Sequence, residues 1–155
     1  MVHNNHGAAI VRATAQYVEL LTPMFDGYRQ FYKQAPDPGQ ARRFLRERLE
    51  RDESVVFLAI EDEADGTGLG FTQLYPSFSS ISLKRVWILN DLFVVPNARR
   101  RGIASALLER AERFAVETQA KGLELKTAKD NPAQRLYERM GWQRDEAFHH
   151  YSRSV

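Results

Sequence analysis

An arginine-rich turn between two apolar segments has the clearest chemical meaning in this sequence. Three arginines, Arg99 to Arg101, are followed directly by Gly102, and Ala104 and the residues after it are typical of a helix start. The first N–H groups of a helix lack partners within it, and the helix dipole adds partial positive charge there. With the guanidinium donors, this pattern predicts a phosphate or pyrophosphate site. The alternative is a solvated helix start with surface arginines.

A second candidate for chemistry is Asp91, which lies in the longest predicted strand, residues 84–95. It is the only acidic side chain between Asp65 and Glu109. A carboxylate in this position can attract a cationic amine or relay the proton of that amine through water. It can also act structurally, by accepting N–H groups from a neighbouring loop. The sequence leaves these roles open.

Composition excludes several other kinds of site. The chain of 155 residues has no cysteine, which excludes disulfides, a thiol nucleophile and thiolate metal ligands. The four histidines lack a metal-binding spacing, so we expect no metal. No apolar run is long enough for a membrane span and no signal peptide is apparent, so we expect a cytoplasmic protein without a membrane partner. The net charge of +2 is too small to indicate a nucleic-acid partner.

The length fits one domain, residues 1–155, of which residues 1–7 are expected to be a flexible tail. Apolar periodicity predicts a strand, two helices, three strands, a helix, a strand, a short helix and one or two final strands. The segments are 8–13, 17–32, 41–49, 54–61, 69–75, 84–95, 101–117, 123–128, 132–140 and 142–152. A hairpin in the first half and strand–helix–strand units in the second predict a mixed α/β sheet with helices on its faces.

Two short motifs occur together in the second half. Arg99 to Ala104 has the pattern Arg, two residues, Gly, one residue, Ala, and it lies between a strand and a helix. Ala133 is followed by three residues, Tyr137, and then a Gly-aromatic pair, Gly141-Trp142. In these motifs the sequence resembles the GCN5-related N-acetyltransferases (GNAT), which use acetyl-CoA. The resemblance implies a mixed, largely antiparallel sheet with helices on both faces, splayed between its fourth and fifth strands.

The resemblance also implies where acetyl-CoA binds. Backbone groups at the end of the fourth strand would pair with the pantetheine arm, and the basic turn would hold the pyrophosphate. Many members have an Asn seven residues before the Tyr, where this chain has Asp130 with Asn131 beside it, so either can serve. The implied cofactor-binding residues are Phe93, Val94, Val95, Arg99, Arg100, Arg101, Gly102, Ile103, Ala104, Ser105, Asp130, Asn131, Ala133 and Tyr137.

For the reaction, the resemblance implies direct transfer of the acetyl group to a primary amine of a small molecule. Tyr137 matches the residue that protonates the departing thiolate, since a phenol is protonated at neutral pH. Asn90-Asp91 stands where polyamine acetyltransferases of the family have a Glu-Asp pair, so Asp91 is the expected catalytic carboxylate. The implied substrate-binding residues are Tyr28, Tyr75, Phe78, Asn90 and Asp91.

Other functions of the same family remain alternatives. The acceptor can be a protein lysine or N-terminus, and the domain can be a sensor that binds CoA without catalysis. Family members often dimerise through late strands, so a homodimer that uses Phe148 to Tyr151 is expected by analogy. The sequence does not name the acceptor amine.

Overall fold

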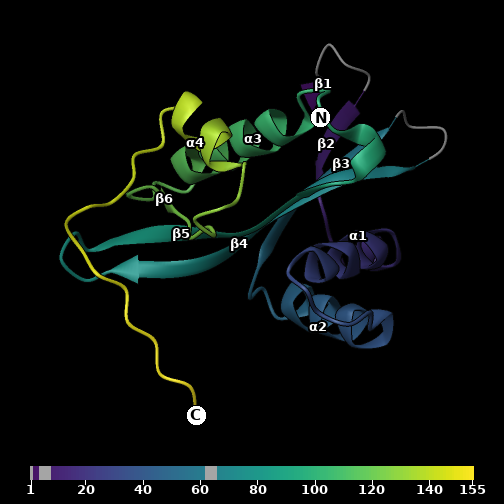
Figure 1. The fold of residues 1–155 in the computed structure, drawn as a ribbon, viewed down its shortest axis with the longest axis horizontal. Helices are drawn as coiled ribbons and strands as arrows, with labels where there is room; N and C mark the ends of the chain where they lie inside the picture. Colours follow the sequence, from purple (N-terminus) through teal and green to yellow (C-terminus); the bar gives the residue numbers. More distant parts are fainter. Residues whose placement is uncertain (1, 4–7, 62–65) are drawn as a thin grey trace. The chain divides into compact units, whose positions relative to one another are not determined.

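The computed structural model describes residues 2–3, 8–61 and 66–155. The chain forms two compact units, residues 1–125 and residues 126–155, and both are traced in Figure 1. The expected flexible tail falls largely on residues outside the description. Its residues Val2–His3 form β1, which pairs antiparallel with β2 (Ala8–Arg12).

The first unit is built on one sheet. Within the described residues the sheet has six strands in the order β1-β2-β3-β4-β5-β6, and only the β5–β6 pair is parallel. This arrangement confirms the expected mixed, largely antiparallel sheet. The remaining strands are β3 (Val55–Glu61), β4 (Gly68–Ser79), β5 (Lys84–Val94) and β6 (Leu123–Glu124).

The sheet is splayed at β5. Strand β6 pairs with β5 at Trp87 and Ile88, whereas β5 continues to Val94. The last residues of β5 therefore have β4 on one side and no described strand on the other. This splay is the one expected between the fourth and fifth predicted strands, which are β5 and β6 once β1 is counted.

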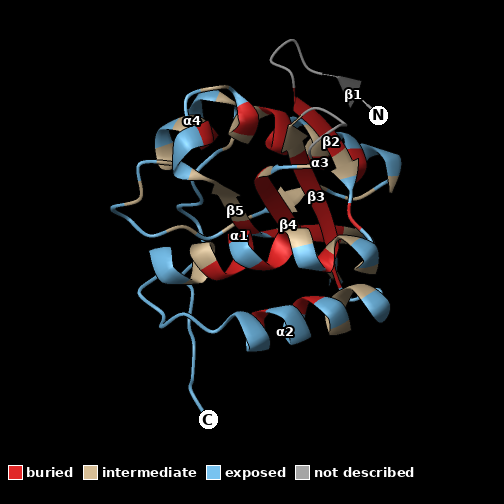
Figure 2. Ribbon diagram, turned by 90° about the vertical axis from the view of Figure 1, so that its right-hand side faces the viewer, coloured by how far each residue is buried: buried red, intermediate tan, exposed pale blue. Residues whose placement is uncertain are grey.

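Helices cover both faces of this sheet (Figure 1). Helices α1 (Val18–Phe31) and α2 (Pro38–Glu50) lie on one face, and α3 (Ile103–Glu117) lies on the other. Helix α2 begins with the Asp37 side chain accepting from the Gln40 N–H at 3.0 Å, a typical helix cap. Figure 2 shows the buried strands between the helices and the exposed outer surface of α2.

One extra residue in β5 changes which face its side chains point to. Gln73 of β4 is paired with Asp91 but Leu74 is paired with Leu89, so Asn90 forms a β-bulge. Before the bulge, the Trp87 ring lies 5.0 Å from the Phe114 ring of α3, measured between centroids. After it, odd-numbered residues of β5 face α1 instead.

The α1 side of β5 is identified by Phe93. The ring of Phe93 lies 6.4 Å from the ring of Phe71, which itself contacts Phe25 of α1 in an edge-on arrangement. A Cβ atom on Gly27 of α1 would lie 3.3 Å from Phe93 Cζ. Because side chains alternate along a strand, Asp91 shares this face with Phe93.

Several boundaries differ from the sequence prediction. Residues 76–79, predicted as a loop, extend β4, and Pro76 is tolerated because that part of β4 lies beyond its last β3 pair, Val55–Leu74. Strand β6 has two residues rather than the predicted 123–128. Helix α1 runs through Pro23 without interruption, where a kink or two helical pieces were expected.

The prediction of final strands over residues 142–152 is wrong. No helix or strand is present in residues 143–155. Phe148 and Tyr151 are 82% and 87% exposed, so these two rings are not packed into a core. A strand needs a hydrogen-bonding neighbour, and within the described part of the chain this segment has none.

The close approach of β4 and β5 generates a stability prediction. A Cβ atom on Gly70 would lie 2.6 Å from the backbone oxygen of Phe93 and 3.2 Å from Val94 Cα. Because backbone must move to make room, Gly70→Ala should lower the free energy of unfolding by about 1–3 kcal/mol, measured by urea denaturation. Gly39→Ala is the control, since its nearest atom, Asp37 Oδ1, is 3.8 Å away. Equal effects of the two variants would contradict the close approach.

Candidate functional site

A buried carboxylate, Asp91, is the centre of the candidate site on the α1 side of the sheet. Only 2% of the surface of Asp91 is exposed to solvent. Gln73, which is directly opposite in the register and fully buried, donates its Nε2 hydrogen to Asp91 Oδ2. Asn90 Nδ2 donates to the other oxygen, Oδ1, at 2.9 Å. The carboxylate is thus held by two amide side chains from neighbouring strands.

The surroundings of Asp91 change its proton affinity. Burial raises the pKa of Asp91 above its ordinary value, and this is the largest effect. Hydrogen bonds from Gln73, Asn90 and Tyr28 act in the opposite direction and favour the charged form. The net result is a raised pKa, which makes the carboxylate a better proton acceptor at neutral pH.

Two tyrosines lie beside this carboxylate. The Tyr28 hydroxyl, from α1, donates to the backbone oxygen of Asn90 at 3.1 Å and also hydrogen-bonds the Asp91 side chain. Burial and the charge of Asp91 raise the pKa of the half-buried Tyr75, with Arg48 opposing the shift, so Tyr75 stays protonated at neutral pH. The structure therefore brings together four of the expected substrate-binding residues, namely Tyr28, Tyr75, Asn90 and Asp91.

Phe78, the fifth expected substrate-binding residue, lies elsewhere. It is about five residues, or roughly 17 Å, along β4 from Gln73. By alternation it is on the opposite face of the strand, and its ring is 71% exposed. The guanidinium carbon of Arg85 lies 4.7 Å from the ring centroid. The structure places Phe78 with Arg85 near the hairpin tip, apart from Asp91.

The basic turn has the geometry of a helix start without a cap. Gly102 precedes α3 with φ of 75°, which favours glycine, and no side chain caps the helix. The first turn of α3 carries no acidic residue. The N–H groups from Ile103 to Ser105 therefore have no intrahelical or side-chain acceptor among the described residues.

The three arginines of the turn differ in their partners. Arg99 Nε donates to the backbone oxygen of Val94 at 3.1 Å. Arg101 Nη2 forms an ion pair with Glu61 Oε1 at 2.8 Å. Arg100, with φ of 61°, pairs with no carboxylate in the described ranges. Arg99 and Arg101 thus stabilise the turn, and Arg100 is the arginine left to meet an anion.

The edge of β5 offers backbone groups at the splay. The Val95 N–H donates to the Leu69 oxygen at 2.9 Å, so Val95 is turned toward β4. Backbone groups alternate in direction along a strand, and Val94 and Leu92 therefore point away from β4. Of the three expected residues, only Val94 faces the splay. Leu92 also faces the splay but was not among the expected residues. Which residues of β5 point away from β4 depends on the strand register, and the sequence does not reveal that register.

The remaining predicted cofactor residues belong to the second unit. Asp130 is exposed, whereas Asn131 Oδ1 accepts from the Ala133 N–H at 3.0 Å and so stabilises the turn before α4 (Gln134–Arg139). Tyr137 is 9% exposed, and its ring centroid lies 5.9 Å from that of Trp142.

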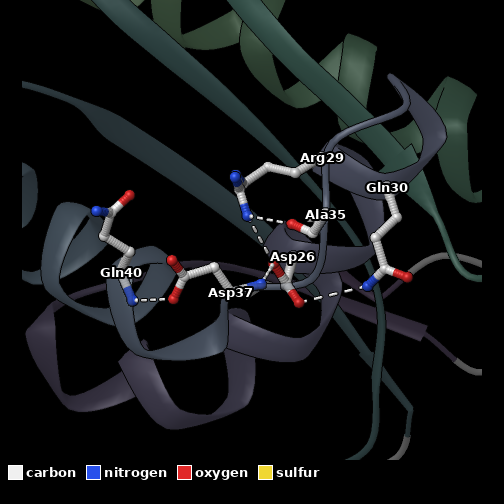
Figure 3. A network of polar contacts seen from close by, with 6 residues as sticks. All are labelled: Asp26, Arg29, Gln30, Ala35, Asp37 and Gln40. Carbon is white, nitrogen blue, oxygen red and sulfur yellow. Dashed lines mark hydrogen bonds and ion pairs between the residues drawn. The ribbon is translucent and has the colours of Figure 1, made fainter.

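Asp26 is the other buried carboxylate among the described residues. It accepts from Arg29 Nη1 at 2.9 Å and from the Asp37 N–H at 3.1 Å through Oδ1, and from Gln30 Nε2 at 3.3 Å through Oδ2 (Figure 3). Because both oxygens bind α1 or the loop after it, Asp26 fixes the connection between α1 and α2. Of these two buried carboxylates, Asp91 is therefore the one that lies near the splay of the sheet.

Comparison with known proteins identifies the family. A family model described as "Acetyltransferase (GNAT) family" matches residues 18–142. The chain belongs to the GNAT family. An uncharacterized N-acetyltransferase of Bacillus subtilis, YhfO, is 48% identical over 136 residues, covering 87% of this chain and 89% of that protein. A probable acetyltransferase of Haemophilus influenzae is 33% identical over 141 residues, covering 83% and 95% respectively.

Solved structures agree with the GNAT assignment. The crystal structure of a probable acetyltransferase has a TM-score of 0.90 and 47% identity, covering 95% of this chain and 97% of that one. An aminoglycoside N-acetyltransferase in complex with CoA has a TM-score of 0.78 and 19% identity, with full coverage of both chains. At that identity the second likeness shows a shared fold. These matches confirm the predicted fold class.

Neither a membrane-crossing helix nor a cluster of metal-binding side chains occurs in the described part of the chain. None of the described helices combines the length and the apolar character that a membrane crossing requires. No cluster of three or more His, Asp or Glu side chains in the same residues has an arrangement that could hold a metal ion.

The raised pKa of Asp91 predicts a pH-dependent stability. The folded protein binds this proton more tightly than the unfolded chain, so wild-type unfolding free energy should fall as pH rises from about 4 through the folded-state pKa. Asp91→Asn removes the titrating group, so the variant should gain stability relative to wild type over that range. Urea unfolding from about pH 4 to about pH 8 measures the difference. A difference that stays constant with pH would contradict the raised pKa.

Proposed function

We propose that this chain transfers the acetyl group of acetyl-CoA directly to a primary amine of a small molecule. The observation that carries the proposal is the placement of two kinds of group on one strand. Asp91 is a buried carboxylate on the α1 side of β5, and Val94, about three residues or roughly 10 Å further along, turns its backbone toward the splay.

The residues of the first unit fit acetyl-CoA. The uncapped start of α3 leaves the N–H groups of Ile103, Ala104 and Ser105 for the pyrophosphate, and Arg100 lies in the turn that leads into this helix start. The edge at Leu92 and Val94 suits the pantetheine arm, whose amides can add to β5 as a strand does. When bound, acetyl-CoA supplies the activated carbonyl that an amine attacks. From the family resemblance, we extend the cofactor site to Asp130 or Asn131, Ala133 and Tyr137.

On the acceptor side, we assign Asp91 to attract the ammonium group and take its proton. Because its residue is only 2% exposed, the proton reaches the carboxylate through a water molecule. Tyr28, Tyr75 and Asn90 surround the carboxylate and provide hydroxyl and amide groups that orient the amine. Loss of the proton leaves the nitrogen lone pair available for attack.

Tyr137 is the proposed donor of a proton to the departing sulfur. Its place in the second motif supports this role, and a phenol is protonated at neutral pH. By analogy with other members of the family, we also propose that the protein is a cytoplasmic homodimer. The acceptor is to be identified by thiol release from acetyl-CoA over a panel of small primary amines.

The cofactor site is tested by introducing negative charge. Ser105→Glu adds a carboxylate to the first turn of α3, which suits the helix dipole but repels a pyrophosphate. It should weaken calorimetric CoA affinity by about tenfold or more without lowering the unfolding midpoint. Gly102→Glu should weaken CoA binding more, although its left-handed φ of 75° also strains the backbone.

Gly122→Glu is the matched control, since no atom lies within 4 Å of a Cβ placed there. It should keep wild-type affinity for CoA. Wild-type affinity in a folded Ser105→Glu protein would place the cofactor elsewhere.

The role of Tyr137 predicts a separation of turnover from binding. Tyr137→Phe removes the hydroxyl and keeps the ring, so kcat should fall by about 10²-fold while CoA affinity changes little. Stopped-flow thiol release and calorimetry measure the two quantities. Tyr151→Phe, at an 87% exposed position of the same unit, should retain full turnover. Full turnover in Tyr137→Phe, with chemistry rate-limiting, would remove Tyr137 as the proton donor.

A further inference from the structure

Gln73 is a buried polar residue to which nothing in the sequence drew attention. It lies in the middle of β4, and its residue is fully buried. Its Nε2 hydrogen is donated to Asp91 Oδ2, across the β4–β5 register. A polar group buried to this degree is costly unless hydrogen-bonded, so its presence in the middle of the sheet requires an explanation.

The amide of Gln73 has no other described role. Its Oε1 atom is buried and has no hydrogen-bond partner among the described residues. Among the described residues, the side chain therefore links β4 to β5 alone, and these two strands already share backbone hydrogen bonds. Within the described ranges, the bond to Asp91 is the one hydrogen bond that its amide group makes. A buried amide with an unpaired oxygen lowers stability, so a stabilising role alone does not explain it.

The other donors to Asp91 differ from Gln73 in their exposure or their target. The hydroxyl of Tyr28 also bonds the carboxylate, but Tyr28 is only partly buried. Asn90 Nδ2 donates to Oδ1, but Asn90 is exposed, so water can replace it. Thr72 is fully buried, yet its hydroxyl donates to the backbone oxygen of Asp91 at 2.8 Å and does not reach the carboxylate. Gln73 is thus the fully buried donor that acts on the carboxylate itself.

We propose that Gln73 is a positioning residue that keeps the Asp91 carboxylate ionised and fixes the direction of its Oδ2 atom. This proposal rests on the proposed function, in which Asp91 attracts the acceptor ammonium and takes its proton. A buried carboxylate tends to become neutral, and a neutral acid neither attracts a cation nor accepts a proton. A donor that water cannot replace opposes that tendency.

The groups that face Asp91 come from three elements. Tyr28 of α1 hydrogen-bonds the carboxylate, and Asn90 is its neighbour on β5. Tyr75 of β4 lies close enough for the charge of Asp91 to raise the pKa of its hydroxyl. Arg48 of α2 acts on Tyr75. Burial and the charge of Asp91 raise the pKa of Tyr75, so Tyr75 stays protonated near neutral pH, and the acidic limb of the activity profile should report Asp91.

The proposal is tested with Gln73→Met, which keeps the length of the side chain and removes its donor. The pKa of the Asp91 carboxyl, followed by carbon-13 NMR, should rise by about one to two pH units. The acidic limb of kcat/KM should move to higher pH by the same amount, with recovery toward the wild-type plateau at alkaline pH. An unchanged pKa, or a raised pKa with an unmoved acidic limb, would overturn the proposal.

Thr72→Val is the matched control on the same strand. It also removes one buried hydrogen bond to Asp91, but from the backbone oxygen. It should lower stability and leave the Asp91 pKa and the pH profile in place. An equal shift in both variants would mean that loosening of the strand, rather than the lost donor, moves the pKa, and would also overturn the proposal.

A measurement on the wild-type protein covers the case in which Gln73→Met does not fold. The chemical shifts of the Gln73 side-chain amide protons should change with pH in step with that of the Asp91 carboxyl carbon. Amide proton shifts that do not change over the Asp91 titration would overturn the proposal.

Asp91→Asn separates this proposal from the proposed function. Wild-type kinetics of Asp91→Asn across the pH range would refute the acceptor role of Asp91, whatever the effect of Gln73→Met on the Asp91 pKa.

Discussion

The extra residue in β5 is the constraint on which the rest of the site depends. In a regular strand that kept Trp87 and Leu89 against α3, Asp91 would also point to α3, into an apolar layer that includes Phe114. The bulge at Asn90 turns the carboxylate to the α1 side, where Gln73 and the hydroxyl of Tyr28 meet it. A local irregularity of one residue thus decides whether the chain has a charged group at its splayed strand or an unpaired charge in its core.

The two buried carboxylates show how the same chemical group serves different ends. Asp26 accepts from a guanidinium, an amide side chain and a backbone N–H, all within α1 and the loop that follows it. These bonds close the connection between two helices. Asp91 is bonded by side chains of three elements, Gln73 of β4, Asn90 of β5 and Tyr28 of α1, and burial raises its pKa. Burial alone therefore does not distinguish Asp26, which fixes a connection between helices, from Asp91, the proposed proton acceptor, whereas the partners of their oxygens differ.

The sequence predicted what depends on periodicity and on local turn chemistry. Neighbouring residues alone were enough to predict four features, namely β2, β3, α3 and the basic turn at Gly102. Asp91 stood out because no other acid is near it in the chain. Gln73 and Leu92 were not predicted, because their roles depend on register and on the bulge, which link residues far apart in sequence. The final strands over residues 142–152 failed for a related reason, since strand formation depends on a partner that local composition does not reveal.

The bond between Arg99 and the Val94 carbonyl has a consequence for solubility. A strand edge with free N–H and C=O groups is a template on which a second copy of the chain can add, and such addition leads to aggregation. At the splay, β5 has such an edge. The Arg99 guanidinium occupies the last carbonyl of the strand at 3.1 Å and places a positive charge beside it. Another chain must therefore displace a charged group before it can extend the sheet. The N–H of Val94, which has no acceptor in the part of the chain that the structure describes, stays open to a ligand that brings its own acceptor.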